Sequence, residues 1–222
     1  MRTTLPAAEP AGSSHNRRGI VFVLSAPSGA GKTSLSQRLR ADMTDVVQVT
    51  TCTTRSPRPG ERDGHDYHFL SYAVFEQRVA AGDFLEWAQV HGHLYGTLRQ
   101  SVDEATARGQ DVLLVIDVQG AAQLRAVHVD AVQVFVVPPS WEALAERLQA
   151  RGSEAPGVQA QRLLVARQEL AHYTAYDYVV INDQLDQAVH TLKSIILAER
   201  QRIARLGLAP IASLLAAPLT KG

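Results

Sequence analysis

The sequence predicts an α/β fold in which a mostly parallel sheet is flanked by helices. Two observations carry this prediction. Short apolar runs rich in β-branched residues alternate with longer segments of helical periodicity, and one such run leads through a glycine-rich turn into a helix. A length of 222 residues and an apolar content of 45% suit one large domain, or one domain that carries insertions.

The elements of this fold are expected in a regular order along the chain. The strands are the apolar runs at 20–25, 47–52, 112–117, 132–137 and 177–181. The helices are the periodic segments at 32–41, 99–108, 119–127, 141–150 and 184–204. Gly109 directly follows the second of these helices, and glycine is typical of a helix end.

Two segments interrupt the alternation. Residues 53–98 contain a turn-rich basic stretch, a short helix near 72–81 and a strand at 84–90 that returns as a hairpin, which predicts a small inserted β-rich subdomain. Residues 147–167 are polar and punctuated by glycine, which is typical of a mobile segment. At the ends, residues 1–18 have the composition of a disordered extension, and the tail at 206–222 is apolar but broken by proline.

One motif between a predicted strand and a predicted helix is the most informative. Its sequence is Ser25-Ala26-Pro27-Ser28-Gly29-Ala30-Gly31-Lys32-Thr33. Strand, glycine-rich turn and helix together direct backbone N–H groups at a phosphate chain, with Lys32 near the β- and γ-phosphates and Thr33 on Mg²⁺. Ala26 stands where the G-x-x-x-x-G-K-[ST] pattern has its first glycine, which costs little if this residue needs no positive φ. A flexible turn that happens to contain Gly-Lys-Thr is the alternative.

Several charged residues are further candidates, each with an ordinary alternative. Arg55 and Arg58 lie on a proline-stiffened turn and suit a dianionic phosphate, although a solvated basic loop has the same pattern. Glu86, in the middle of a strand, either accepts hydrogen bonds from a guanine edge or faces solvent. Asp117 ends an apolar run downstream of the phosphate loop, as a carboxylate on the Mg²⁺ side does.

Three arginines lie on or beside the polar segment. Arg147 and Arg151 are four residues apart and therefore share one face of a helix, and Arg162 follows. They indicate either a lid that brings positive charge to a transferring phosphoryl group, or a surface helix with glutamate partners.

Composition limits the partners and the compartment. The 22 basic and 22 acidic residues give zero formal net charge, which argues against a protein that coats nucleic acid or an anionic membrane. No apolar run reaches the roughly 18 residues of a membrane span, and residues 1–18 lack the apolar region of a secretory signal. The single cysteine, Cys52, suits a reducing compartment. We therefore expect a cytoplasmic protein with no nucleic-acid or membrane partner, whose oligomeric state the sequence leaves open.

From about Arg18 to about Arg205 the sequence resembles the guanylate kinase family. The matching blocks are, in chain order, 25–33, 53–61, 64–67, 84–88, 95–97, 116–120, 147–152 and 176–183. The resemblance implies a P-loop kinase fold with a GMP-binding insert at 51–98, a mobile lid at 144–167, and a core made of 19–50, 99–143 and 168–205. It also implies transfer of the ATP γ-phosphoryl group to GMP, and to dGMP, with Mg²⁺.

The resemblance also implies roles for individual residues. ATP would be bound by Ala26, Pro27, Ser28, Gly29, Ala30, Gly31, Lys32, Thr33 and Asn182. GMP would be bound by Thr51, Arg55, Arg58, Tyr67, Glu86, Tyr95, Thr97 and Asp117. The catalytic residues would be Lys32, Arg147, Arg151 and Arg162, and Thr33 would ligate Mg²⁺, partly through water with Asp117.

One position departs from the family, and one alternative function stays open. The family commonly has an acidic residue two positions before Asp117, where this chain has Val115 on a strand that is expected to be buried on both faces. The alternative is a catalytically inactive guanylate-kinase-like module that binds proteins. Such a module would be expected to lose Lys32 or the paired arginines, which this sequence keeps.

Overall fold

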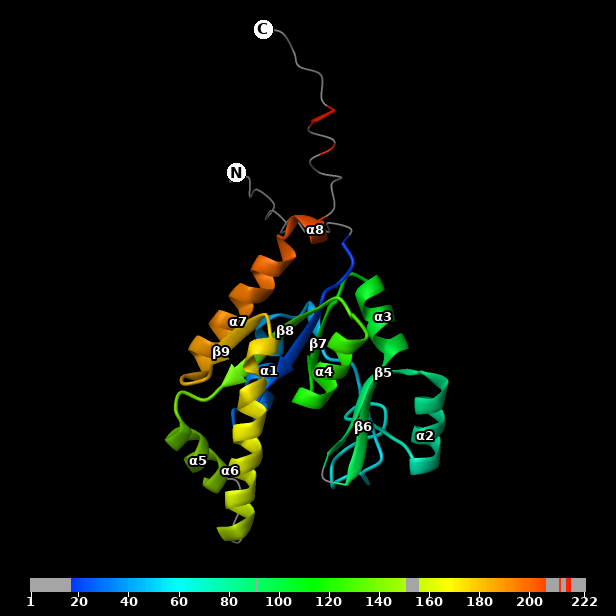
Figure 1. Ribbon diagram of the computed structural model, residues 1–222. Helices are drawn as coiled ribbons and strands as arrows, with labels where there is room; N and C mark the ends of the chain where they lie inside the picture. Colours follow the sequence, from blue (N-terminus) through cyan, green and yellow to red (C-terminus); the bar gives the residue numbers. More distant parts are fainter. Residues whose placement is uncertain (1–16, 91, 151–155, 207–211, 213–214, 217–222) are drawn as a thin grey trace, which may run out of the picture.

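A five-stranded parallel sheet forms the centre of the molecule, as seen in the computed structural model, which describes residues 17–90, 92–150, 156–206, 212, 215 and 216 (Figure 1). The strand order is β2-β7-β1-β8-β9. The bounds are Val21–Ser25 for β1, Val46–Val47 for β2, Asp111–Val115 for β7, Ala131–Val137 for β8 and Tyr178–Ile181 for β9. Every pair of neighbours in this order is parallel, so the predicted α/β class with a mostly parallel sheet is confirmed.

Helices cover both faces of this sheet. One face packs against α1 (Lys32–Asp42) and α7 (Leu185–Arg200), the other against α3 (Arg99–Ala107) and α4 (Val118–Ala126). A short α8 (Ile203–Leu206) follows α7. Among the residues that the structure describes, no helix has the length and apolar character needed to cross a membrane.

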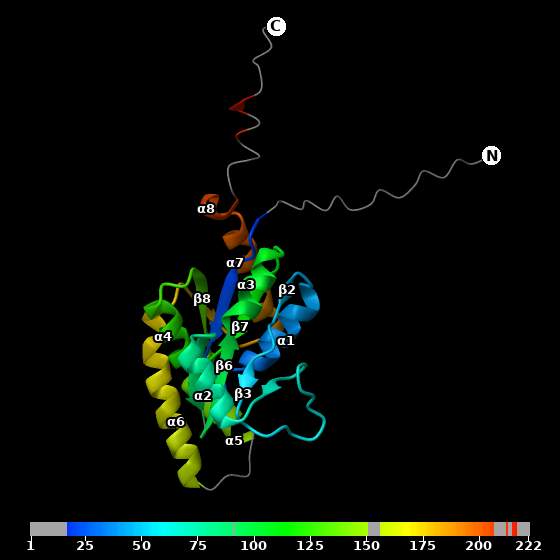
Figure 2. The same ribbon diagram turned by 90° about the vertical axis from the view of Figure 1, so that its right-hand side faces the viewer.

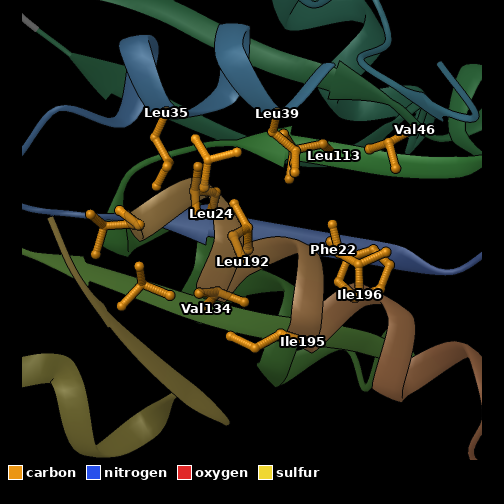
Figure 3. Packing of buried hydrophobic residues seen from close by; sticks show 14 of the residues in the cluster. Phe22, Leu24, Leu35, Leu39, Val46, Leu113, Val134, Leu192, Ile195 and Ile196 are labelled. Atoms are coloured by element: carbon orange, nitrogen blue, oxygen red, sulfur yellow. The ribbon is translucent and has the colours of Figure 1, made fainter. Parts of the chain in front are cut away.

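The largest core lies between the sheet, α1 and α7 (Figure 3). Phe22 and Leu24 of β1 point into it, Leu35 and Leu39 come from α1, and Leu192 comes from α7. All five side chains are fully buried. Because β1 is apolar on both faces, it can occupy the middle of the sheet. The loop that follows β1 therefore begins at the carboxyl end of the central strand.

Residues 52–98, which we call the insert, form a second sheet of order β4-β3-β6-β5. Its elements are β3 (Cys52–Thr53), β4 (His68–Phe69), α2 (Tyr72–Ala81), β5 (Phe84–Val90) and β6 (His93–Leu98). It has its own small core of Cys52, Phe75, Phe84 and Leu94. Burial also raises the pKa of the Cys52 thiol to about 11, which suits a packing role for this residue.

Two helices, α5 (Trp141–Ala150) and α6 (Pro156–Leu170), form a pair between β8 and β9. Leu144 and Leu148 of α5 pack against Ala166 of α6, and a 3₁₀ helix (Ala171–Ala175) returns the chain to β9. Figures 1 and 2 show the α5–α6 pair and the insert below the same end of the main sheet. The polar segment expected at 147–167 is therefore largely helical where it is described, and its mobility stays a prediction.

Two of the predicted elements are wrong in detail. The strand expected at 47–52 is two short strands, because β2 pairs with β7 in the main sheet whereas β3 pairs with β6 and β4 in the insert. The helix expected at 184–204 ends at Arg200, and α8 begins separately at Ile203. The other helices of the main sheet lie within a residue or two of their predicted bounds.

The packing of α7 predicts a stability difference between two leucines of that helix. Leu192 is fully buried in the core, whereas Leu197 is 51% exposed. We expect Leu192→Ala to lower the free energy of unfolding by about 2–5 kcal/mol. Leu197→Ala, the matched control, should change it by about 0.5 kcal/mol or less. Urea denaturation followed by circular dichroism measures both values, and equal losses would contradict this description of the core.

Candidate functional site

The loop between β1 and α1 has the backbone of a phosphate-binding loop. Gly29 and Gly31 have φ values of 87° and 93°, which only glycine adopts without strain. Among the described residues, His128 alone combines a side chain with a positive φ, so Ala26 needs no glycine at its position. The buried Ala26 instead accepts a hydrogen bond from Lys32 Nζ to its carbonyl at 2.6 Å. The departure of Ala26 from the loop pattern therefore leaves the loop geometry intact.

Asn182 supports this loop from the end of β9. Its Nδ2 donates to the Ala30 carbonyl at 2.8 Å, and its backbone N–H donates to the Val137 carbonyl of β8 at 2.8 Å. A Cβ on Gly31 would lie 2.3 Å from the same Nδ2, so the loop and the amide are in direct contact. The buried Asn182 thus ties the loop to the edge of the sheet.

A cavity of about 370 Å³ opens beside the loop. Gly29, Gly31, Ser34, Arg147, Ala150, Asn182, Asp183 and Leu185 line it. Arg147 reaches it from α5 and donates from Nη1 to the Asn182 carbonyl at 2.9 Å. This arrangement brings one of the three predicted arginines to the loop. Arg162 lies partly exposed on α6, and Arg151 falls outside the described residues.

The α5–α6 pair lies directly on the phosphate loop. A Cβ on Gly29 would come within 3.1 Å of the side chains of Leu144 and Leu148. Glu169, near the end of α6, accepts a hydrogen bond from the Ser28 N–H at 3.1 Å. Burial raises the pKa of the Glu169 carboxyl, while the Ser28 N–H and Lys32 act in the opposite direction. Sequence reasoning missed Glu169, because no local pattern links it to a loop so distant in the chain.

A second cavity, of about 170 Å³, lies between the insert and the main sheet, and Glu86 is in its wall. Its lining residues are Thr51, Tyr67, Glu86, Ala88, Val90, Tyr95, Gly96, Val115, Ile116 and Asp117. Glu86 is only 5% exposed, and the Thr97 hydroxyl donates to its Oε1 at 2.6 Å. The pKa of Glu86 is raised to about 7, mainly by burial and to a smaller extent by the nearby Asp117, while the hydrogen bonds from Thr97 act in the opposite direction. The mid-strand carboxylate therefore faces this cavity.

Asp117 connects the second cavity to the sheet. Its carboxylate accepts the Gly120 N–H at 2.8 Å and so caps α4. The Ser25 hydroxyl at the end of β1 donates to the carbonyls of Ile116 and Asp117, at 3.0 and 3.1 Å. These bonds fix the ends of β1 and β7 side by side. Asp117 and the phosphate loop consequently lie at the same edge of the sheet.

Arg55 is held by a partner that the sequence analysis did not single out. Its guanidinium donates two hydrogen bonds to Glu61, at 3.0 and 2.8 Å, and lies 5.5 Å from the centre of the Tyr67 ring. Glu61 also accepts the Arg58 backbone N–H at 2.7 Å. The pKa of Glu61 lies below its usual range, mainly because of the Arg55 hydrogen bonds. The Arg58 side chain is exposed, so the stiff turn presents one braced arginine and one exposed arginine.

Val115 lies where the Glu86 cavity and the region of the phosphate loop meet. It is partly exposed and lines both the Glu86 cavity and a larger one of about 530 Å³ that also includes Lys32 and Thr33. The expectation that its strand is buried on both faces is wrong at this residue. β7 ends at Val115, which packs partly against the main core and also lines both cavities.

Comparisons with known proteins give one consistent relationship. The family model described as guanylate kinase matches residues 18–199. The guanylate kinase of Symbiobacterium thermophilum is 48% identical over 198 residues, which are 89% of this chain and 94% of that protein. The guanylate kinase of Syntrophotalea carbinolica is 49% identical over 190 residues, 86% of this chain and 90% of that protein. A crystal structure of guanylate kinase from Anaplasma phagocytophilum matches with a TM-score of 0.73 at 30% identity, covering 91% of this chain and 98% of that chain.

The contact between Thr97 and Glu86 predicts a measurable change in acidity. Because the Thr97 hydroxyl stabilises the charged carboxylate, Thr97→Val should raise the pKa of Glu86 above its value of about 7. ¹³C NMR titration of glutamate-labelled protein measures this pKa, and Glu86→Gln identifies the resonance. A Glu86 pKa that stays the same or falls in Thr97→Val would show that the hydroxyl does not support the charge.

Proposed function

The chain belongs to the guanylate kinase family, and we propose that its two cavities hold the two substrates of that family's reaction. The chain is an enzyme that transfers the γ-phosphoryl group of ATP to GMP, giving ADP and GDP. The observation that supports the assignment of the cavities is the buried Glu86 carboxylate, which faces a cavity at the same edge of the sheet as the phosphate loop.

Glu86 is the proposed determinant of guanine binding. Guanine presents N–H donors at N1 and N2, and an ionised carboxylate can accept both hydrogen bonds. Adenine presents an acceptor at N1, which would leave the buried carboxylate unpaired. Thr97 orients the Glu86 side chain, and Thr51 and Asp117 line the same cavity, so they are proposed contacts of the base.

The GMP phosphate is assigned to the arginine-bearing turn. Arg55 and Arg58 supply the positive charge, and Tyr67 and Tyr95 are the proposed hydroxyl donors. The centres of the Tyr67 and Tyr95 rings are 6.1 Å apart in an edge-to-face arrangement, and the Arg55 guanidinium lies over the Tyr67 ring. Because Glu61 occupies one edge of Arg55, it sets the direction of the guanidinium before any phosphate binds.

ATP is assigned to the phosphate loop, residues 26–33, with Asn182 supporting it. The loop N–H groups and the α1 N-terminus suit the β- and γ-phosphates, and Lys32 adds a compact positive charge. Mg²⁺ is the proposed cofactor, with Thr33 as its protein ligand and Asp117 acting through water. Among the described residues no three His, Cys, Asp or Glu side chains are placed to hold a metal ion, and the proposed Mg²⁺ would be held mainly by phosphates and water. When bound, it would neutralise phosphate charge.

Phosphoryl transfer depends on positioning and on stabilisation of charge more than on covalent help from the protein. Two facing sites at one edge of the sheet can bring the donor and acceptor phosphates in line. Lys32 and the arginines Arg147, Arg151 and Arg162 are the proposed catalytic cations. The α5–α6 pair, which contacts the loop through Leu148, is the proposed lid. We propose the cytoplasm as the place of this reaction.

The substrate assignment predicts strong selectivity among nucleoside monophosphates. We expect ADP formation with GMP, and a kcat/KM for AMP lower by roughly 10⁴-fold, because the site pairs with a guanine edge. A coupled ADP assay with GMP, AMP, UMP and CMP measures this, with Lys32→Met as the inactive control. Comparable values for GMP and AMP would overturn the role of Glu86. No turnover with any of them would instead favour a module that only binds proteins.

The pKa of Glu86 predicts how activity depends on pH. The carboxylate must be ionised to accept both guanine donors, so kcat/KM for GMP should fall about tenfold per pH unit as the pH drops below about 7. At saturating GMP the decline in kcat should shift to lower pH, because bound guanine stabilises the charged form. In Glu86→Gln, kcat/KM should be low and should lack this step. A wild-type profile that stays flat from about pH 5.5 to about pH 8, on either side of that pKa, would contradict the assignment.

A further inference from the structure

Strand β5, which carries Glu86, lies at the edge of the insert's sheet, and a side chain from the main domain pairs with its free backbone. Gln123 of α4 accepts the Trp87 N–H at 3.0 Å through Oε1 and donates from Nε2 to the Trp87 carbonyl. One amide side chain therefore satisfies both backbone groups of the residue next to Glu86, as a neighbouring strand would do. Sequence reasoning placed no weight on Gln123.

The same helix also limits the space available to the Glu86 carboxylate. Asp117, Gly120 and Gln123 follow one another at intervals of three residues and lie on the same side of α4. A Cβ on Gly120 would lie only 2.5 Å from Glu86 Oε2, so the carboxylate fits against the helix only because residue 120 is glycine. Thr97 Oγ1 contacts the other oxygen, Oε1. Glu86 is thus held between β6 and α4.

We propose that Gln123 is a positioning residue for guanine recognition, which fixes β5 on α4 so that Glu86 meets the base in one defined place. The inference rests on the proposed function of Glu86. A carboxylate that accepts hydrogen bonds from both N1–H and N2–H of guanine must be placed correctly for both donors. The Thr97 hydrogen bond constrains only one oxygen of the Glu86 carboxylate. Gln123 clamps the adjacent residue of the strand from the opposite side. It thereby couples the insert to the helix that begins at Asp117.

The test uses Gln123→Met, which keeps the length of the side chain and its suitability for a helix but removes both hydrogen bonds. We measure kcat/KM for GMP and for IMP, whose base has the N1 donor but lacks the 2-amino group. With Glu86 displaced, KM for GMP should rise about tenfold, a loss on the order of that from one or two hydrogen bonds. The GMP:IMP ratio of kcat/KM should fall, and KM for ATP should stay unchanged.

Gln77→Met is the matched control, since Gln77 is exposed on α2 of the insert and the same substitution there should change none of these values. Gly120→Ala gives a second line of evidence, because its Cβ should push Glu86 and lower the GMP:IMP ratio in the same way. If Gln123→Met does not fold, Gln123→Glu decides the question, because it keeps the acceptor for the Trp87 N–H and loses the donor to the Trp87 carbonyl.

The outcomes separate the two proposals. Wild-type protein that does not phosphorylate GMP contradicts the proposed function. Wild-type activity on GMP, together with an unchanged GMP:IMP ratio in Gln123→Met, overturns the positioning role. An equal rise in KM for GMP and for ATP in that variant also overturns it, since that pattern reports general loss of structure.

Discussion

The parallel pairing of β1 with its two neighbours is the constraint on which the site depends. The carboxyl ends of parallel strands lie along the same side of a sheet. The residues that follow these strands are therefore close together even when they are far apart in the sequence. The phosphate loop follows β1, Val115 ends β7 with Asp117 two residues further on, and Asn182 follows β9. Ser25 and Asn182 then lock these ends to one another through hydrogen bonds to backbone carbonyls. The positions of the chemical groups are therefore set mainly by the sheet and only locally adjusted by side chains.

Around this edge the molecule places two smaller units, each with its own apolar contacts. The insert contributes Glu86 and the arginine turn, and the α5–α6 pair contributes Arg147 and Glu169. Both reach the main sheet through specific polar contacts: Gln123 joins the insert to α4, and Arg147 and Glu169 join the helical pair to Asn182 and the phosphate loop. Charged groups from separate parts of the chain thus converge on a small region while each is supported by its own element.

The sequence predicted best those parts of the candidate site whose backbone depends on residues that are neighbours in the chain. The phosphate loop, its flanking strand and helix, and the hairpin that carries Glu86 all depend on neighbouring residues, and their backbone follows from local periodicity and turn chemistry. The contacts that the sequence did not indicate join residues that are distant in the chain, such as Glu169 with Ser28 and Gln123 with Trp87. Val115 shows a related limit. An apolar residue ending an apolar run looks buried, and only the place where the strand stops reveals that its side chain faces a cavity.

The core of the main sheet is much larger than the core of the insert, and this difference affects how cooperatively the molecule unfolds. The core beneath β1 spans the sheet and two helices, whereas Cys52, Phe75, Phe84 and Leu94 make up the buried core of the insert. Regions with few buried contacts open locally at a lower free energy than the whole molecule does. The insert, which carries Glu86 and Arg55, is therefore expected to open locally at a lower free energy than the parallel sheet. A substitution within the core of the insert should therefore first disrupt the wall of the proposed GMP cavity, while the parallel sheet stays folded.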